Sequence, residues 1–314
     1  MGLGLFVALS SGAQDLPSDP EGTSDVPIVI HDRSSVSMVL VPVVAKREGD
    51  FVTRLQPDDL RLWVDSRPIP IETFQYERAP LSVVILQDLS GSMAGLELDI
   101  SRAGLHRLLD GIRDRDELAV ATFAGGNTRV EVPFTTDRRT LEETLAIWDG
   151  FGTTGLYDAV AWLPHLSMAA TRRKRAALLI TDGVDNASEI PPAEAREIVR
   201  RAELPVYVLG LETSGEEADE GTFRYSDLLE NLAEATGGRY HSIESTKEAE
   251  EAIAEILEEL RRQYVLGFSI LGEGLERYRR IEVTGRGRAE RAELVHRRGY
   301  RGTRPAVTER SRER

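Results

Sequence analysis

Two hydrophobic patterns alternate along the chain and divide it into three parts. The first part, from Ser37 to Tyr76, holds short β-rich runs separated by turn residues. From Leu81 onwards, continuous apolar runs alternate with segments of helical period, which is typical of a parallel sheet covered by helices on both faces. After Arg262 the β pattern returns. The β runs outside the central part are expected at 38–44, 60–64, 69–74, 264–268, 278–283 and 293–296.

The central part predicts a doubly wound sheet. Its buried strands are expected at 83–86, 118–123, 177–180 and 206–209. Its helices are expected at 96–112, 141–148, 156–168, 193–202 and 228–235. A Gly-Gly-Asn turn at 125–127 indicates a hairpin, which would add one antiparallel edge strand to the sheet.

The clearest predicted helix is the last one. Ser245 and Glu248 form a capping-box pattern, and an apolar stripe from Ala249 to Leu260 follows on one helix face. The opposite face is rich in Glu and is interpreted as a solvated surface. The strands beyond this helix most simply complete the N-terminal β unit. The predicted fold is therefore α/β, a doubly wound and mostly parallel sheet inserted in a small β-sandwich that the N- and C-terminal flanks form.

Composition narrows the functional classes. The 314 residues include 39 Lys plus Arg and 53 Asp plus Glu, a net charge of −14, so we expect no nucleic-acid partner. The absence of cysteine excludes disulfides, thiolate metal sites and thiol catalysis. The apolar stretch Leu3–Leu9 is too short to span a membrane but fits the core of a secretory signal, although no Lys or Arg precedes Arg33. We expect an exported protein, periplasmic or extracellular, with a slightly apolar frayed N-terminus as the alternative.

Three loops carry the candidate chemistry. Asp88, Ser90 and Ser92 follow one buried strand at alternate positions, so that their three oxygens can face one point. A second acidic loop with Asp182 follows another buried strand, and a Gly-rich loop at 152–155 opens a helix between them. The carboxyl ends of strands are where open α/β sheets bind ligands. Hard oxygen ligands with two carboxylates suit a small cation that keeps waters, as Mg²⁺ does. Metal-free turns capped by Ser90 or Ser92 are the alternative.

The sequences Asp-Leu-Ser-Gly-Ser-Met at 88–93, Thr-Gly-Leu-Tyr-Asp at 154–158 and Thr-Asp-Gly at 181–183 resemble the metal-ion-dependent adhesion site of von Willebrand factor A domains. The resemblance implies that Asp88, Ser90 and Ser92 bind the metal directly and that Thr154 and Asp182 bind it directly or through water. It also implies Mg²⁺, with Mn²⁺ or Ca²⁺ as alternatives, and a partner protein whose Asp or Glu carboxylate completes the coordination. Asp158 and Asp185 are interpreted as supporting and turn residues. Gly155 departs from the family pattern, where Ala or Pro is expected, and would loosen the helix start.

The flanking segments are similar to those of a bacterial group of exported von Willebrand factor A-related proteins. The predicted organisation is a signal-peptide remnant and linker at 1–25, half of the β unit at 26–79, the von Willebrand factor A domain at 80–262, the other half of the β unit at 263–300 and a disordered tail at 301–314. The expected function is Mg²⁺-dependent protein binding in adhesion or scaffolding, without catalysis. A Mg²⁺-dependent hydrolase and a structural envelope protein with metal-free loops are the alternatives.

Overall fold

A computed structural model describes most of the chain beyond its N-terminal segment. The described residues are 37–76, 79–172, 174–183, 185–200, 204–212, 225–270 and 277–301. The predicted signal remnant and linker at 1–25 lie outside them. So does the predicted tail except for Arg301, which ends the last strand.

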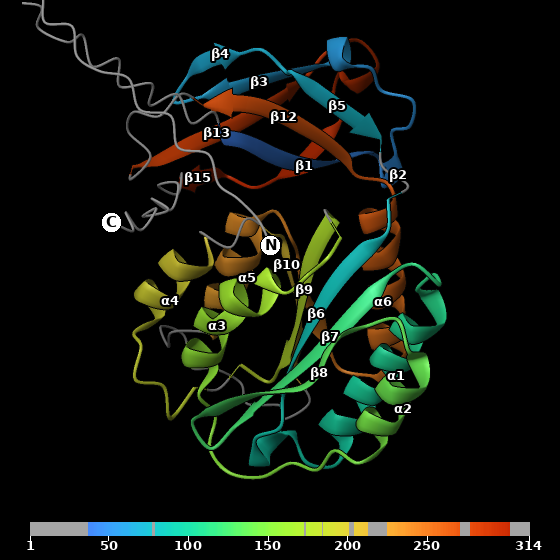
Figure 1. Ribbon diagram of the computed structural model, residues 1–314, viewed down its shortest axis with the longest axis vertical. Coiled ribbons are helices and arrows are strands. Elements are labelled where there is room, and N and C mark those ends of the chain that lie inside the picture. The colour runs from blue at the N-terminus through green and yellow to red at the C-terminus, as the bar shows by residue number, and fades with distance from the viewer. Residues whose placement is uncertain are drawn as a thin grey trace, which may run out of the picture. The chain divides into compact units, whose positions relative to one another are not determined.

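A six-stranded sheet forms the centre of the α/β part (Figure 1). Its strand order is β11-β10-β9-β6-β7-β8, and every neighbouring pair is parallel except β7 and β8. The strands are β6 (Leu81–Asp88), β7 (Glu117–Ala124), β8 (Asn127–Thr135), β9 (Lys174–Thr181), β10 (Val206–Leu211) and β11 (Tyr240–Ile243). The antiparallel edge strand confirms the hairpin that the sequence predicts at 125–127.

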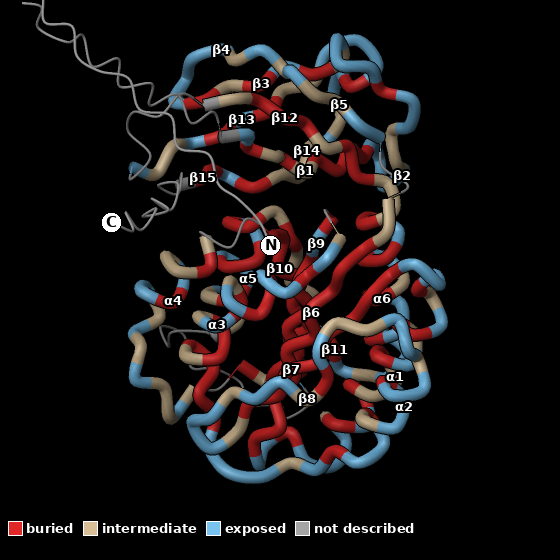
Figure 2. Tube along the Cα trace, in the orientation of Figure 1, coloured by how far each residue is buried: buried red, intermediate tan, exposed pale blue. Residues whose placement is uncertain are grey.

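Helices cover both faces of this sheet, so its central strands are apolar along their length. Strand β6 is buried at all of its residues (Figure 2). One core joins Val83 and Ile85 to α1 (Leu96–Gly111), α2 (Arg138–Ala146) and α6 (Thr246–Arg261). The other core joins the alternate strand residues, such as Val84 and Leu86, to the remaining helices. These are α3 (Leu156–Met168), α4 (Pro192–Val199) and α5 (Tyr225–Thr236).

The two flanks build a β-sandwich around a third core, which the fold prediction anticipates. One sheet has the order β14-β1-β12-β5, with β2 beside β1, and the other has the order β15-β13-β3-β4. Apolar residues of both sheets, among them Val41, Leu62, Leu266 and Ile281, share one cluster. The strands are β1 (Ser37–Arg47), β2 (Asp50–Phe51), β3 (Leu60–Val64), β4 (Arg67–Ile69), β5 (Thr73–Tyr76), β12 (Tyr264–Ile270), β13 (Tyr278–Gly285), β14 (Glu293–His296) and β15 (Gly299–Arg301).

One predicted strand is wrong. The run at 69–74 is divided between β4 and β5, which belong to different sheets. Pro70 has no amide hydrogen to donate to a sheet, so the chain leaves one ladder there and joins the other at Thr73.

The Glu-rich face of α6 is also not wholly solvated. Glu259 is 1% exposed, and its Oε1 lies 2.7 Å from both Lys46 Nζ of β1 and Arg239 Nε. Lys46 is itself buried and reaches Glu255 Oε1 at 2.7 Å as well. Burial lowers the pKa of Lys46, but the two glutamates outweigh that effect and hold the pKa above its usual value. An ion-pair cluster therefore connects the sandwich strand β1 with the last helix of the α/β part.

In the described part of the chain, each helix is either too short or too polar to cross a membrane.

Candidate metal centre

Strands β6 and β9 lie side by side at the point where the strand order reverses, and their carboxyl ends carry the two acidic loops. Asp88 is the last residue of β6, and Asp182 follows the last residue of β9. The sheet thus brings together two carboxylates that are 94 positions apart in the sequence.

Asp88 is fully buried and is fixed by hydrogen bonds to both of its carboxylate oxygens. The amide of Ser90 donates to Oδ1 at 2.8 Å, and the hydroxyl of Thr181 donates to Oδ2 at 2.7 Å. Burial raises the pKa of Asp88 to about 6, and the hydrogen bonds from Thr181 and Ser90 offset part of that rise. The charge of Asp182 raises the pKa further. Asp88 is therefore an anionic group that the protein alone stabilises poorly.

Two serine hydroxyls lie next to this carboxylate. Ser90 Oγ and Ser92 Oγ are 3.2 Å apart on the turn that follows β6. Ser90 is buried and Ser92 is exposed, so the pair extends from the sheet edge to the solvent. A neighbouring glycine, Gly150, allows the close approach of another loop: a Cβ there would lie 2.8 Å from Ala94 N and 2.9 Å from Ser90 O.

The loop of Thr154 is held against the loop of Asp182 by hydrogen bonds in both directions. Thr154 N donates to Asn186 Oδ1 at 2.8 Å, and the amides of Asn186 and Ala187 both donate to Thr154 O at 3.0 Å. Asp185 Oδ1 accepts from Leu156 N at 2.8 Å at the start of α3. The buried Thr154 side chain is thereby fixed relative to the end of β9.

Asp158, in the first turn of α3, holds the residues that follow the Asp182 loop. Its two carboxylate oxygens accept from Glu189 N at 3.0 Å and from Ile190 N at 2.9 Å. These hydrogen bonds confirm the supporting role predicted for Asp158.

The close packing of two loops explains why position 155 is a glycine. It is the N-cap of α3, and a Cβ at this position would lie 3.3 Å from Gly126 Cα in the β7–β8 turn. The same turn is bound to the loop because Gly125 N donates to Thr153 O at 2.6 Å. The departure from the family pattern therefore allows the edge hairpin to pack closely on the loop of Thr154.

Sequence reasoning misses the residues that position the candidate ligands from a distance. Gln87 donates from Nε2 to the carbonyl of Asp88 at 2.7 Å and accepts from Ser101 Oγ of α1 at 2.5 Å. A glutamine inside an otherwise apolar strand is the signal that could have identified it. The role of Asn186 as a partner of Thr154 depends on how the loops meet, and no local pattern predicts it.

The oxygen atoms at this edge are of the kinds that bind a hard divalent cation. Within the described ranges, no three His, Cys, Asp or Glu side chains gather as metal ligands. The candidate set instead combines the carboxylates of Asp88 and Asp182 with hydroxyl oxygens, which are the ligands that Mg²⁺ accepts together with water. A cation here would neutralise the two mutually repelling carboxylates, one of which is completely buried.

Comparisons with known proteins agree with this architecture. Residues 83–184 match the family model of the von Willebrand factor type A domain. An uncharacterized protein of Borreliella burgdorferi is 26% identical over 189 residues, which are 52% of this chain and 54% of that protein. The human inter-alpha-trypsin inhibitor heavy chain H3 is 26% identical over 204 residues, 60% of this chain and 22% of that protein. The chain thus spans about half of the first relative and about a fifth of the second.

Solved structures show the same fold. A von Willebrand factor type A protein from Catenulispora acidiphila superimposes with a TM-score of 0.50 at 14% identity, covering 84% of this chain and 73% of that one. A mutant of the PilB minor pilin from Streptococcus sanguinis gives a TM-score of 0.50 at 15% identity, covering 62% of this chain and 64% of that one. The central α/β part of the chain, with its mostly parallel sheet and the acidic loops at its carboxyl edge, is a von Willebrand factor type A domain.

Proposed function

We propose that this protein is a binding module that recruits a partner protein through a Mg²⁺ ion held at the carboxyl edge of the central sheet. Asp88, Ser90 and Ser92 would bind the ion directly, and Thr154 and Asp182 directly or through water. The observation that carries the proposal is the buried carboxylate of Asp88, which lies beside two hydroxyls 3.2 Å apart and within range of the charge of Asp182. Mn²⁺ and Ca²⁺ are the alternative cations for the same oxygen ligands.

The bound cation would supply an open position for one carboxylate of the partner, an Asp or a Glu. The protein's own residues would do the remaining work. Thr181 and the Ser90 amide hold both oxygens of Asp88, and Asn186 fixes Thr154. These contacts would hold the ligands in place through the chain's own groups, and such preorganisation favours affinity.

We propose binding rather than catalysis for this site. In the proposed arrangement, both carboxylates and both serine hydroxyls are engaged as ligands, so none of them is left as a general base or nucleophile.

We also propose that the protein acts outside the cytoplasm, supported by the signal-like stretch Leu3–Leu9 of the sequence.

The metal site is tested by measuring how Mg²⁺ changes the free energy of unfolding in urea. A ligand present at about a hundred times its Kd should stabilise the native chain by about 2.7 kcal/mol. We expect Asp88→Ala to fold, because it removes a buried charge, and to lose this Mg²⁺ effect completely. Asp149→Ala, which removes a neighbouring carboxylate outside the proposed ligand set, serves as the control and should keep the effect. If Asp88→Ala binds Mg²⁺ with the affinity of the native chain in a calorimetric titration, the assignment of Asp88 as a ligand is wrong.

The partner is tested separately by capture from an envelope extract of the source cells. The full chain is used as bait in Mg²⁺, in EDTA and as the Asp88→Ala variant, and retained proteins are identified by mass spectrometry. A protein retained only by the native chain in Mg²⁺ supports the proposal. An identical set under all three conditions refutes the metal bridge, even if Mg²⁺ itself binds.

A further inference from the structure

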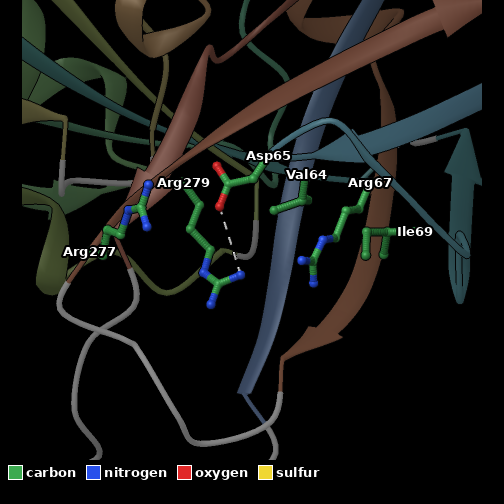
Figure 3. Close-up of a pocket in the computed structure, with 6 residues that line it drawn as sticks. All are labelled: Val64, Asp65, Arg67, Ile69, Arg277 and Arg279. Carbon is green, nitrogen blue, oxygen red and sulfur yellow. Dashed lines mark ion pairs between the residues drawn. The ribbon is translucent and has the colours of Figure 1, made fainter.

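A basic pocket lies on the four-stranded sheet of the β-sandwich, among strands that the metal centre does not use. Its volume is about 430 Å³, and its lining consists of Val64, Asp65, Arg67, Ile69, Arg277 and Arg279 (Figure 3). A volume of this size matches small-molecule sites in proteins, which begin at about 300 Å³.

The arginines lie at the ends of neighbouring strands. Asp65 and Ser66 both have positive φ, 48° and 64°, and form the two-residue turn between β3 and β4, so that Arg67 follows the turn directly. Arg279 is the second residue of β13 (Tyr278–Gly285), and Arg277 directly precedes this strand. Figure 3 shows the side chains of Arg67 and Arg279 extending in the same direction on either side of Val64.

The turn is fixed to β13, so the pocket has a defined geometry. Asp65 N donates to Arg280 O at 3.0 Å, and Arg280 N donates to Asp65 Oδ1 at 3.0 Å. These two hydrogen bonds hold the end of β3 against the strand that carries Arg279. Arg67 of β4 and Arg279 of β13 therefore extend from strands whose adjoining ends are joined by hydrogen bonds.

The charges of the lining do not balance. The lining contains three guanidinium groups and one carboxylate, which leaves a local charge of two positive units on a chain whose net charge is −14. Arg279 Nη1 lies 3.9 Å from Asp65 Oδ2, which is too long for a hydrogen bond, so its N–H groups are not consumed by Asp65. Among the described residues, Arg67 and Arg277 make no ion pair. The pocket thus offers more hydrogen-bond donors than one carboxylate of a ligand could accept.

A buried hydroxyl lies close to the same charges. Tyr300 is 2% exposed, and its phenol oxygen has no hydrogen-bond partner in the described part of the chain. Burial raises the pKa of Tyr300, and the charges of Arg279 and Asp65 also act on it, which places the phenol within electrostatic range of the pocket. Tyr300 does not line the pocket, so its phenol is not counted among the donors available to a ligand.

We propose that this pocket binds a small organic phosphate monoester. The three terminal oxygens and the nearly double negative charge of a phosphate monoester match the fork-like donors and the local charge of the three arginines. The apolar side chains of Val64 and Ile69 would contact the carbon part of the ligand. Asp65 would disfavour longer polyphosphates by repulsion.

The test is calorimetric titration of the full chain with phenyl phosphate in EDTA, so that the metal centre does not contribute. We expect saturable binding, tighter than that of inorganic phosphate or of benzoate, and weaker at high salt. Arg67→Gln and Arg277→Gln should each lower the affinity for phenyl phosphate at least about tenfold. Arg279 is left unchanged because it neighbours Asp65.

Arg61→Gln is the matched control, because Arg61 is exposed on the same strand β3 but does not line the pocket. It should bind phenyl phosphate with native affinity. Inorganic phosphate that binds as tightly as phenyl phosphate excludes a carbon-contacting site and overturns the organic part of the proposal. Equal affinity in the native chain and both pocket variants, or no saturable heat up to about 10 mM phenyl phosphate, overturns it entirely.

Discussion

At the residue scale, the metal centre depends on a few small side chains as much as on its carboxylates. Gly150 lies where any Cβ would meet the backbone of the loop that carries Ser90. The proposed ligands could be read from the sequence because Asp88, Ser90 and Ser92 form a local motif. The contacts of Thr181 with Asp88 and of Asn186 with Thr154 could not, because they join loops about 30 to 90 positions apart and depend on the folded sheet.

We predict that Gly150→Ala lowers Mg²⁺ affinity by about tenfold, because changes around a metal site that displace its ligands have effects of this size. The new methyl group would also cost about 1–3 kcal/mol in overpacking against Ala94 N and Ser90 O. Affinity is measured by calorimetry and stability by urea unfolding. Gly104→Ala in the middle of α1, where a Cβ would be 3.4 Å from Ala249 Cβ, is the control. It should keep native Mg²⁺ affinity, and a similar loss in both variants would indicate a general effect of added methyl groups.

At the element scale, helices with strong local signals begin and end where the sequence predicts. Helix α3 spans 156–168 as expected, and α6 begins after Ser245, whose hydroxyl accepts from Glu248 N. Short strands are harder to predict from the sequence. Strands β11 and β15 have only four and three residues, and the hydrophobic pattern does not predict them. The sequence does not predict that Glu259 is buried. The helical period places Glu259 on the polar face of α6, but it does not show that Lys46 of β1 and Arg239 supply cations to it.

Lys46→Met is expected to destabilise the protein by about 1.5–3 kcal/mol, because it removes one of the two cations that pair with the buried carboxylate of Glu259 and leaves Arg239 as the other. Urea unfolding of the native chain and the variant measures the difference. The matched control is Lys247→Met, which breaks an exposed pair with Glu251 on the same helix and should change stability by less than about 1 kcal/mol. Equal effects of the two substitutions would show that the buried cluster contributes no more than a surface pair.

At the scale of the whole molecule, the insertion of the α/β domain between two halves of a sandwich was predictable, because the β pattern ends near Tyr76 and returns at Tyr264. The contacts that join distant segments could not be predicted from the sequence. Asp116 accepts hydrogen bonds from Leu81 N at 2.8 Å and from Arg113 N at 2.7 Å, and also from the guanidinium of Arg261 at the end of α6. One carboxylate thus connects the start of the central strand, the turn before β7 and the last helix.

This carboxylate predicts how stability depends on pH. Burial raises the pKa of Asp116, but the hydrogen bonds from Arg261, Arg113 and Leu81 outweigh it and hold the pKa below its usual value. A depressed native pKa stabilises the folded chain above the ordinary pKa of Asp, about 4, and this stability is lost as the pH falls through the native value. Urea unfolding between neutral and acidic pH should therefore show a shallower acid loss for Asp116→Asn than for the native chain. Parallel curves would exclude Asp116 as a source of the acid sensitivity.

The register of β5 and β12 places Tyr76 directly opposite Tyr264. The α/β domain therefore leaves and rejoins the sandwich at a single pair of facing residues. A tight turn between these two positions would make an ordinary hairpin of the sandwich, complete without its insert. The chain connection is therefore modular: an exchange of the inserted domain would require this crossing point to be preserved, together with partners on α6 for the buried Lys46.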